Sequence, residues 1–144
     1  MSFPAKPPTP DGRRSQLLKL LSVEGHPQVF VLGSQARYVT IYAQQVRALN
    51  LVSALAKSGY FSRSTRLAVV GGGIAGLTAA AAAARAGVGR VSVFEREPTV
   101  MRLQRNSEKR YVHPHIYDWP FEKEPHTEAD LPVLGWSAGI AAAV

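Results

Sequence analysis

Cysteine is absent from all 144 residues of the chain. Disulfide bonds and cysteine-ligated metals are therefore excluded, and a reducing compartment fits this composition. The sequence also has no apolar run near the roughly 20 residues that a membrane-spanning helix needs. Its first residues lack the apolar core of a signal peptide. These absences predict a cytoplasmic protein with no membrane partner.

Acidic side chains are scarce in the first half of the chain. Residues 1–66 carry nine Lys or Arg against two acids, whereas residues 67–144 carry eight of each. The positive excess could form a surface for nucleic acid or for an acidic partner, or it could be a solvated face. The basic residues are scattered, without aromatic interleaving or a binding motif, which argues against nucleic acid.

The remaining composition, with 46% hydrophobic and 19% charged residues, is that of a soluble globular protein. Residues 1–14 hold four prolines and predict a flexible leader. Residues 15–65 predict a basic extension, with one or two helical turns at 16–23, a short strand at 28–32 and a helix at 40–58.

A strand–helix–strand pattern begins at residue 66. "RLAVV" (66–70) is short and apolar, "AGLTAAAAAARA" (75–86) is a strong helix former, and "RVSVF" (90–94) predicts a second strand. Three such elements within thirty residues predict a right-handed βαβ unit. A short helix is also possible at 99–104, and the last residues predict a strand that enters an alanine-rich helix.

The glycine run between the first strand and the helix has the spacing G-x-G-x-x-G. Gly71 permits a sharp turn, Gly73 leaves room for a pyrophosphate to approach the backbone, and Gly76 lets the helix pack close to the strands. The helix N-terminus offers unpaired N–H groups and a partial positive charge to phosphates. No lysine of a P-loop is present. The predicted cofactor-binding residues of this loop are Gly71, Gly72, Gly73, Ile74, Ala75 and Gly76.

An acidic residue follows at the end of the second strand. Glu95 lies near the offset at which a carboxylate accepts hydrogen bonds from the adenosine ribose. Its charge would repel a 2′-phosphate and so disfavours NADP, although Arg96 beside it could offset this repulsion. Strand, glycine loop, helix and acid together predict an adenine-dinucleotide site at residues 71–76, Glu95 and Arg96.

The stretch 66–97 resembles the amino-terminal ADP-binding motif of FAD-dependent oxidoreductases, with one residue inserted before "RVSVFE". "VTIYAQQVRALNLVSAL" (39–55) and "LQRNSEKRYVHPHIYDWP" (103–120) are similar to a group of bacterial FAD/NAD(P)-binding proteins with little assigned function. The resemblance implies the FAD-binding part of an oxidoreductase, whose substrate it does not name. The competing prediction is a non-catalytic module that binds NAD or another adenine dinucleotide, or that docks onto a partner.

The predicted fold is α/β, with a Rossmann-like, three-layer βαβ core at 66–144 that is incomplete at its carboxyl end, after a basic helical amino-terminal extension. Flavin enzymes contain several domains, so this length predicts a front portion, a truncation or one subunit of a split enzyme. A parallel sheet needs cover on both faces. Self-association, or a partner chain that completes the sheet, is therefore expected.

Three further patterns leave alternatives open. "GWSAG" (135–139) matches a nucleophile elbow, but after Ser137 the chain holds neither the acid nor the histidine of a hydrolase triad. "YVHPHIYDWP" (111–120) could bind a metal, face the cofactor or simply pack. No metal site is predicted from it, and the catalytic residues remain unknown. The side chains whose contact with cofactor or partner is possible but unassigned are Gln44, Gln45, Arg47, Arg102, Arg105 and Arg110.

Overall fold

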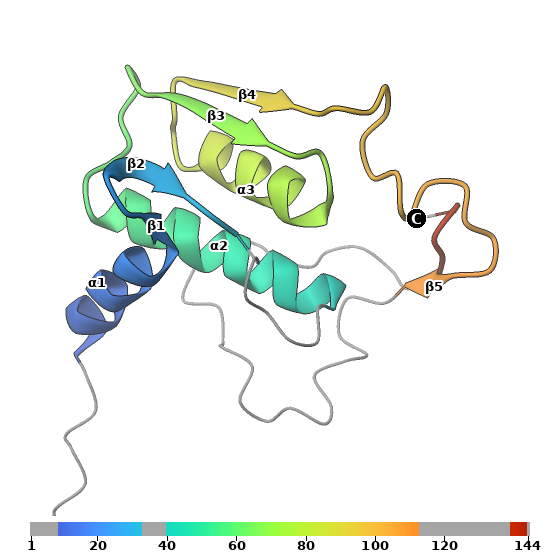
Figure 1. The fold of residues 1–144 in the computed structure, drawn as a ribbon, viewed down its shortest axis with the longest axis horizontal. Helices are drawn as coiled ribbons and strands as arrows, with labels where there is room; N and C mark the ends of the chain where they lie inside the picture. The colour runs from blue at the N-terminus through green and yellow to red at the C-terminus, as the bar shows by residue number, and fades with distance from the viewer. Residues whose placement is uncertain (1–8, 33–39, 113–138, 144) are drawn as a thin grey trace, which may run out of the picture. The chain divides into compact units, whose positions relative to one another are not determined.

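The computed structural model describes residues 9–32, 40–112 and 139–143 (Figure 1). The chain divides into two compact units, Met1–Val31 and Leu32–Val144. The boundary between units therefore falls at residue 31, whereas the sequence patterns placed the start of the dinucleotide-binding domain at residue 66. None of the helices in the described ranges combines the length and apolarity required to cross a bilayer.

The first unit contains a helix and a small hairpin. Helix α1 (Pro10–Leu21) begins at Thr9, whose hydroxyl accepts a hydrogen bond from the Gly12 N–H at 3.2 Å. Strands β1 (Ser22–Val23) and β2 (His26–Phe30) then pair antiparallel. The prediction of a leader up to residue 14 is wrong from Pro10 onward. An N-cap threonine followed by proline at the first helical position starts a helix there.

The second unit is built around a parallel βαβ motif. Strand β3 (Arg66–Val70) pairs with β4 (Arg90–Phe94) in parallel, with Leu67 opposite Val91 and Val69 opposite Val93. Helix α3 (Ile74–Arg85) connects the two strands. Both strands have the predicted bounds, and the helix differs by one residue at each end. The predicted α/β class with a partial Rossmann-like core is confirmed.

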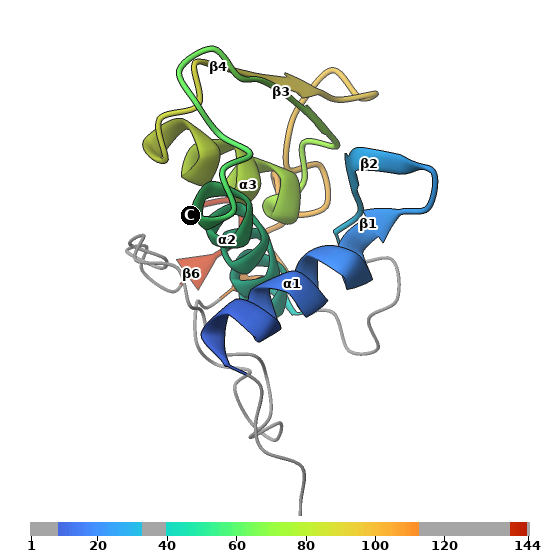
Figure 2. The ribbon, with the colours of Figure 1, turned by 90° about the vertical axis from the view of Figure 1, so that its left-hand side faces the viewer.

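Helix α2 (Ile41–Lys57) packs against α3, which in turn lies against the sheet (Figure 1, Figure 2). Thr40 caps α2 by accepting a hydrogen bond from the Ala43 N–H at 3.0 Å. Small side chains on α3 allow the two helices to approach closely. The buried core joins three residues of each helix to Val88. Its helical members are Ala48, Leu49, Val52, Ala79, Ala82 and Ala83. Every residue from 43 to 55 of α2 except Arg47 is buried, so this helix belongs to the core and not to a separate extension.

The face of the β3–β4 sheet that points away from α3 carries exposed apolar side chains. Leu67 and Val91 pack toward the helices, and the alternation along the strands turns their neighbours the other way. On that second face Val70 is 86% exposed and Phe94, its partner in the register, is 57% exposed. The described residues thus place α2 and α3 on one side of the sheet and leave the other face open. That face carries the apolar pair Val70 and Phe94 at one end and the pair Arg66 and Arg90 at the other.

The chain after β4 is irregular. The segment 99–106 forms bends and turns instead of the short helix expected at 99–104, and Met101 adopts a left-handed conformation with φ of 57° that interrupts any helix. Strands β5 (Tyr111–Val112) and β6 (Gly139–Ile140) pair antiparallel. The described residues after β6 form a turn and not the expected alanine-rich helix.

Candidate functional site

The glycine loop between β3 and α3 is held by its own backbone and by the end of β4. Gly71 has φ of +105°, a conformation that favours glycine, and its N–H donates to the Phe94 carbonyl at 2.8 Å. A Cβ on Gly76 would overlap the Gly71 carbonyl oxygen. These two glycines are therefore required by the fold itself: Gly71 makes the turn, and Gly76 allows the close approach of helix and loop.

Gly72 is tightly enclosed. A Cβ at this position would lie 2.9 Å from Val100 Cγ1 and 3.0 Å from Glu95 Oε2. Its carbonyl accepts a hydrogen bond from the Met101 N–H at 2.9 Å. The absence of a side chain lets the segment after β4 close against the loop, and this contact anchors Met101 at the site.

Gly73 differs from the other glycines of the loop. A Cβ added here would meet no atom within 4 Å, and the backbone, with φ of −81°, is one that any residue adopts. Gly73 is the N-cap of α3 and supplies no side-chain cap. The first N–H groups of the helix, with the positive end of its dipole, therefore face open space beside bare backbone. This is the environment that an anionic group needs.

Glu95 sits at the end of β4 with both carboxylate oxygens engaged by the backbone. Oε2 accepts from the Gly72 N–H at 2.5 Å, and Oε1 accepts from the Glu97 N–H at 3.0 Å. The Glu97 N–H and then the Gly72 N–H stabilise the charged form and lower the pKa of Glu95 below its ordinary value. Glu95 is thus an ionised acceptor at neutral pH. Because a carboxylate has about four lone-pair sites, it retains capacity for further donors.

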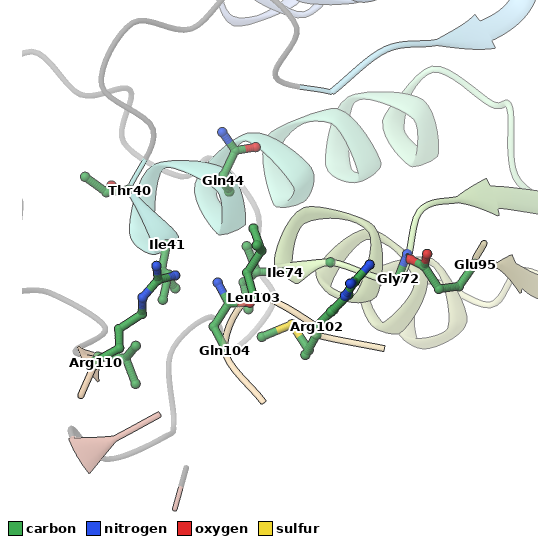
Figure 3. A pocket seen from close by; sticks show the side chains of 13 residues that line it. Thr40, Ile41, Gln44, Gly72, Ile74, Glu95, Arg102, Leu103, Gln104 and Arg110 are labelled. Carbon is green, nitrogen blue, oxygen red and sulfur yellow. The ribbon is translucent and has the colours of Figure 1, made fainter. Parts of the chain in front are cut away.

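The loop and Glu95 form one end of a cavity of about 630 Å³ (Figure 3). The start of α2 and the segment 101–112 form its remaining walls. Its lining residues are Thr40, Ile41, Gln44, Gly72, Gly73, Ile74, Glu95, Met101, Arg102, Leu103, Gln104, Arg110 and Val112. The volume lies within the range of small-molecule sites, which are mostly apolar with a few polar groups.

The cavity brings together only part of the predicted set. Gly72, Gly73, Ile74 and Glu95 line it, whereas Gly71, Ala75, Gly76 and Arg96 are not part of its wall. The Arg96 side chain is 90% exposed, and its guanidinium lies 3.6 Å from Glu97. Arg96 therefore points into solvent, close to an acid that offsets its charge.

The side chains to which the sequence assigned no role also fall into two groups, those that line the cavity and those that do not. Arg102 and Arg110 line the cavity and Arg105 does not; Gln44 lines it, but Gln45 and Arg47 do not. Arg102 donates to Glu97 at 2.5 Å. The histidine-rich stretch from His113 and the serine motif at Ser137 lie outside the described residues. Within the described ranges, no three His, Cys, Asp or Glu gather as a metal would require.

Sequence reasoning missed the apolar wall and the contribution of Thr40 and Ile41. These residues lie thirty or more positions before the glycine loop, and no motif links the two segments. The available signal was the presence of Gln44 and Gln45 in this helix, because glutamine is rarely buried in proteins.

Three observations indicate that the residues of this site fit an adenine dinucleotide. Gly73 leaves space that a side chain would fill, α3 presents an uncapped N-terminus to that space, and an ionised Glu95 stands at its edge. Phosphate oxygens would accept hydrogen bonds from the helix N–H groups, and ribose hydroxyls would donate to the carboxylate.

A comparison with protein families agrees with this geometry. The profile of the NAD(P)-binding Rossmann-like domain matches residues 69–130. Searches of curated proteins and of solved structures gave no significant match. The match begins inside β3 and includes the glycine loop, α3 and β4, which are the elements that build the phosphate end of the cavity. Fold and profile together support a Rossmann-like, NAD(P)-binding type of domain in this part of the chain.

Proposed function

We propose that the chain binds FAD through its ADP moiety and serves as the cofactor-binding part of a flavin-dependent oxidoreductase. The observation that carries this proposal is the open space at Gly73, which the apo fold leaves unfilled although no neighbouring atom requires a glycine there. The pyrophosphate would lie against Gly73 and the first turn of α3. Glu95 would hold the ribose and orient the adenosine half.

FAD is favoured over NAD by the resemblance of residues 66–97 to the ADP-binding motif of FAD-dependent oxidoreductases. NAD remains the alternative, because the profile match names NAD(P) and the glycine loop serves either cofactor. A bound flavin would supply hydride or electron chemistry, while the chain's own residues bind and orient it. Ionised Glu95 disfavours NADP, because its charge would repel a 2′-phosphate.

Direct titration tests the proposal. The purified chain is titrated with FAD, NAD, NADP and ADP by isothermal calorimetry, and the visible spectrum of the protein as purified is recorded. We expect saturable one-to-one binding of FAD and of ADP, with NADP weaker than NAD. Failure of all four ligands to bind overturns the proposal, and binding of NAD without FAD replaces it by the alternative.

A further inference from the structure

The end of the cavity away from Glu95 is formed by elements outside the βαβ motif. Figure 3 shows Glu95 and Gly72 at one end, Ile74 and Leu103 in the middle, and Arg110 at the other end. The start of α2 supplies Thr40, Ile41 and Gln44 to the cavity. Thr40 and Ile41 lie beside Arg110, and Gln44 lies nearer to Ile74 and Leu103 (Figure 3). We call the part of the cavity that these three residues line the α2 end of the cavity. When the glycine loop holds one half of a ligand, the α2 end of the cavity is the space that remains for the other half.

Gln44 is the polar group of the α2 end that calls for an explanation. Its side chain is 7% exposed and lines the cavity, and no hydrogen bond to its amide is found within the part of the chain that the structure describes. The fully buried side-chain atom without a partner in that part is Oε1 of Gln45, so the amide of Gln44 keeps some accessible surface. An amide that is largely enclosed is usually hydrogen-bonded by protein, water or ligand. The cavity is the side from which a partner can reach it.

The surroundings of Gln44 restrict the chemistry of that partner. Ile41, Ile74 and Leu103 line the same cavity as Gln44, and these apolar side chains suit the faces of a flat ring. The amide itself both donates and accepts, so it matches an edge that presents a carbonyl oxygen next to an N–H. The same two-point pairing is used by glutamine on adenine.

We propose that Gln44 reads the amide or imide edge of the ring on the second half of the dinucleotide. This rests on the proposed function, because the glycine loop must hold the ADP moiety for the ring to reach the α2 end. Both the nicotinamide carboxamide and the flavin pyrimidine ring present such an edge. Helix α2 thereby becomes a specificity element that lies before the βαβ motif in the sequence.

The test compares ligands with and without the ring. The full chain and its Gln44→Met variant are titrated by calorimetry with ADP, ADP-ribose, NAD and FAD. Methionine preserves the length of the side chain and removes the hydrogen bonds. We expect the variant to bind the ring-bearing dinucleotide roughly 10- to 100-fold more weakly and to bind ADP and ADP-ribose unchanged. Whether NAD or FAD shows the loss identifies the ring.

Gln45→Met is the matched control. Gln45 is buried on the same helix, at 6% exposed, and its Oε1 has no hydrogen-bond partner among the described residues, but it does not line the cavity. Its substitution should leave the ratio of dinucleotide to ADP affinity unchanged. An equal loss for ADP and for the dinucleotide in Gln44→Met, or no loss for either, overturns the role of Gln44. Failure of ADP to bind the unaltered chain is a different result, which overturns the proposed function as well.

A measurement on the unaltered chain covers the case in which Gln44→Met does not fold. In ¹⁵N-labelled protein, the side-chain amide resonances of Gln44 should shift when the ring-bearing dinucleotide is added and should stay in place with ADP. Shifts of the same size with both ligands, or with neither, contradict the proposal.

Discussion

Substitution of Gly73 tests whether glycine at this position is required for ligand binding or for folding. In Gly73→Ser the new Cβ meets no atom within 4 Å, and φ of −81° suits a non-glycine residue. Serine at an N-cap accepts a hydrogen bond from the first turn and is slightly better than glycine, and it also reduces the entropy of the unfolded chain. We therefore expect the free energy of unfolding in urea to stay the same or to rise by about 0.5 kcal/mol.

The same substitution should weaken dinucleotide binding. The serine hydroxyl takes one N–H of the first turn, which removes a charge-assisted hydrogen bond to phosphate of about 1.5–3 kcal/mol. Its side chain also occupies the space into which the pyrophosphate would fit. Together these effects predict a loss of at least 10-fold in the affinity for ADP and for the dinucleotide, measured by calorimetry.

Gly73→Val extends the series, because the larger side chain blocks the same space without forming a cap. It should abolish binding, while its circular dichroism spectrum remains that of the parent. Ala81→Ser, on the exposed side of α3, is the control and should change neither affinity nor fold. If Gly73→Val binds the dinucleotide as tightly as the unaltered chain does, the phosphates lie elsewhere and the reasoning is refuted.

Four other predictions follow from the structure. Gly76→Ala should lower the free energy of unfolding by about 3 kcal/mol or more, because its Cβ would overlap the Gly71 carbonyl; a urea midpoint equal to that of the parent contradicts this packing. Glu95→Gln should weaken the binding of NAD or FAD about 10-fold and reduce the ratio of the NAD affinity to the NADP affinity. Unchanged NAD and NADP affinities would rule out a ribose contact. Because the Glu97 and Gly72 N–H groups lower the pKa of Glu95, its contribution to binding and stability is present above the unfolded pKa of about 4.3 and is lost as the pH falls through the folded pKa. Affinity should therefore stay constant from pH 8 to 5, and a decline of the Glu95-dependent part in that window would show a raised pKa. The exposed apolar pair Val70 and Phe94 on the open sheet face should cause self-association that Val70→Lys reduces in sedimentation experiments; a stable monomer at all concentrations of the unaltered chain would show that this pair does not drive association.

The βαβ motif was predictable because its determinants are local. Short apolar strands at 66–70 and 90–94 flank a run of alanines, and the glycine run marks the junction. Each signal agrees with the others, and the observed bounds of β3, α3 and β4 follow them to within one residue. Local agreement of this kind is typical of sequences in which propensity and tertiary packing favour the same structure.

The α2 end of the cavity was not predictable in the same way. Its residues come from positions 40–44 and 101–112, which approach only because α2 packs on α3. Sequence periodicity indicated the helix but not its neighbour. It also could not show that Gln44 faces the cavity while Gln45, equally buried, does not. The start of α1 was missed for a different reason: the prolines of the first residues suggested a leader, although Thr9 and Pro10 form a good helix start.

The central claim is that an adenine dinucleotide binds at the glycine loop, and backbone amide resonances test it most directly. In ¹⁵N-labelled chain, addition of FAD, NAD or ADP should shift the amide signals of Gly73, Ile74 and Ala75, because their N–H groups would face the phosphates. The signal of Gly72, which donates to Glu95, should shift as the ribose engages that carboxylate. Saturable shifts confined to these residues and the cavity walls are the predicted result. Ligand binding that leaves residues 72–75 unchanged, or no binding at millimolar concentration, would contradict the account.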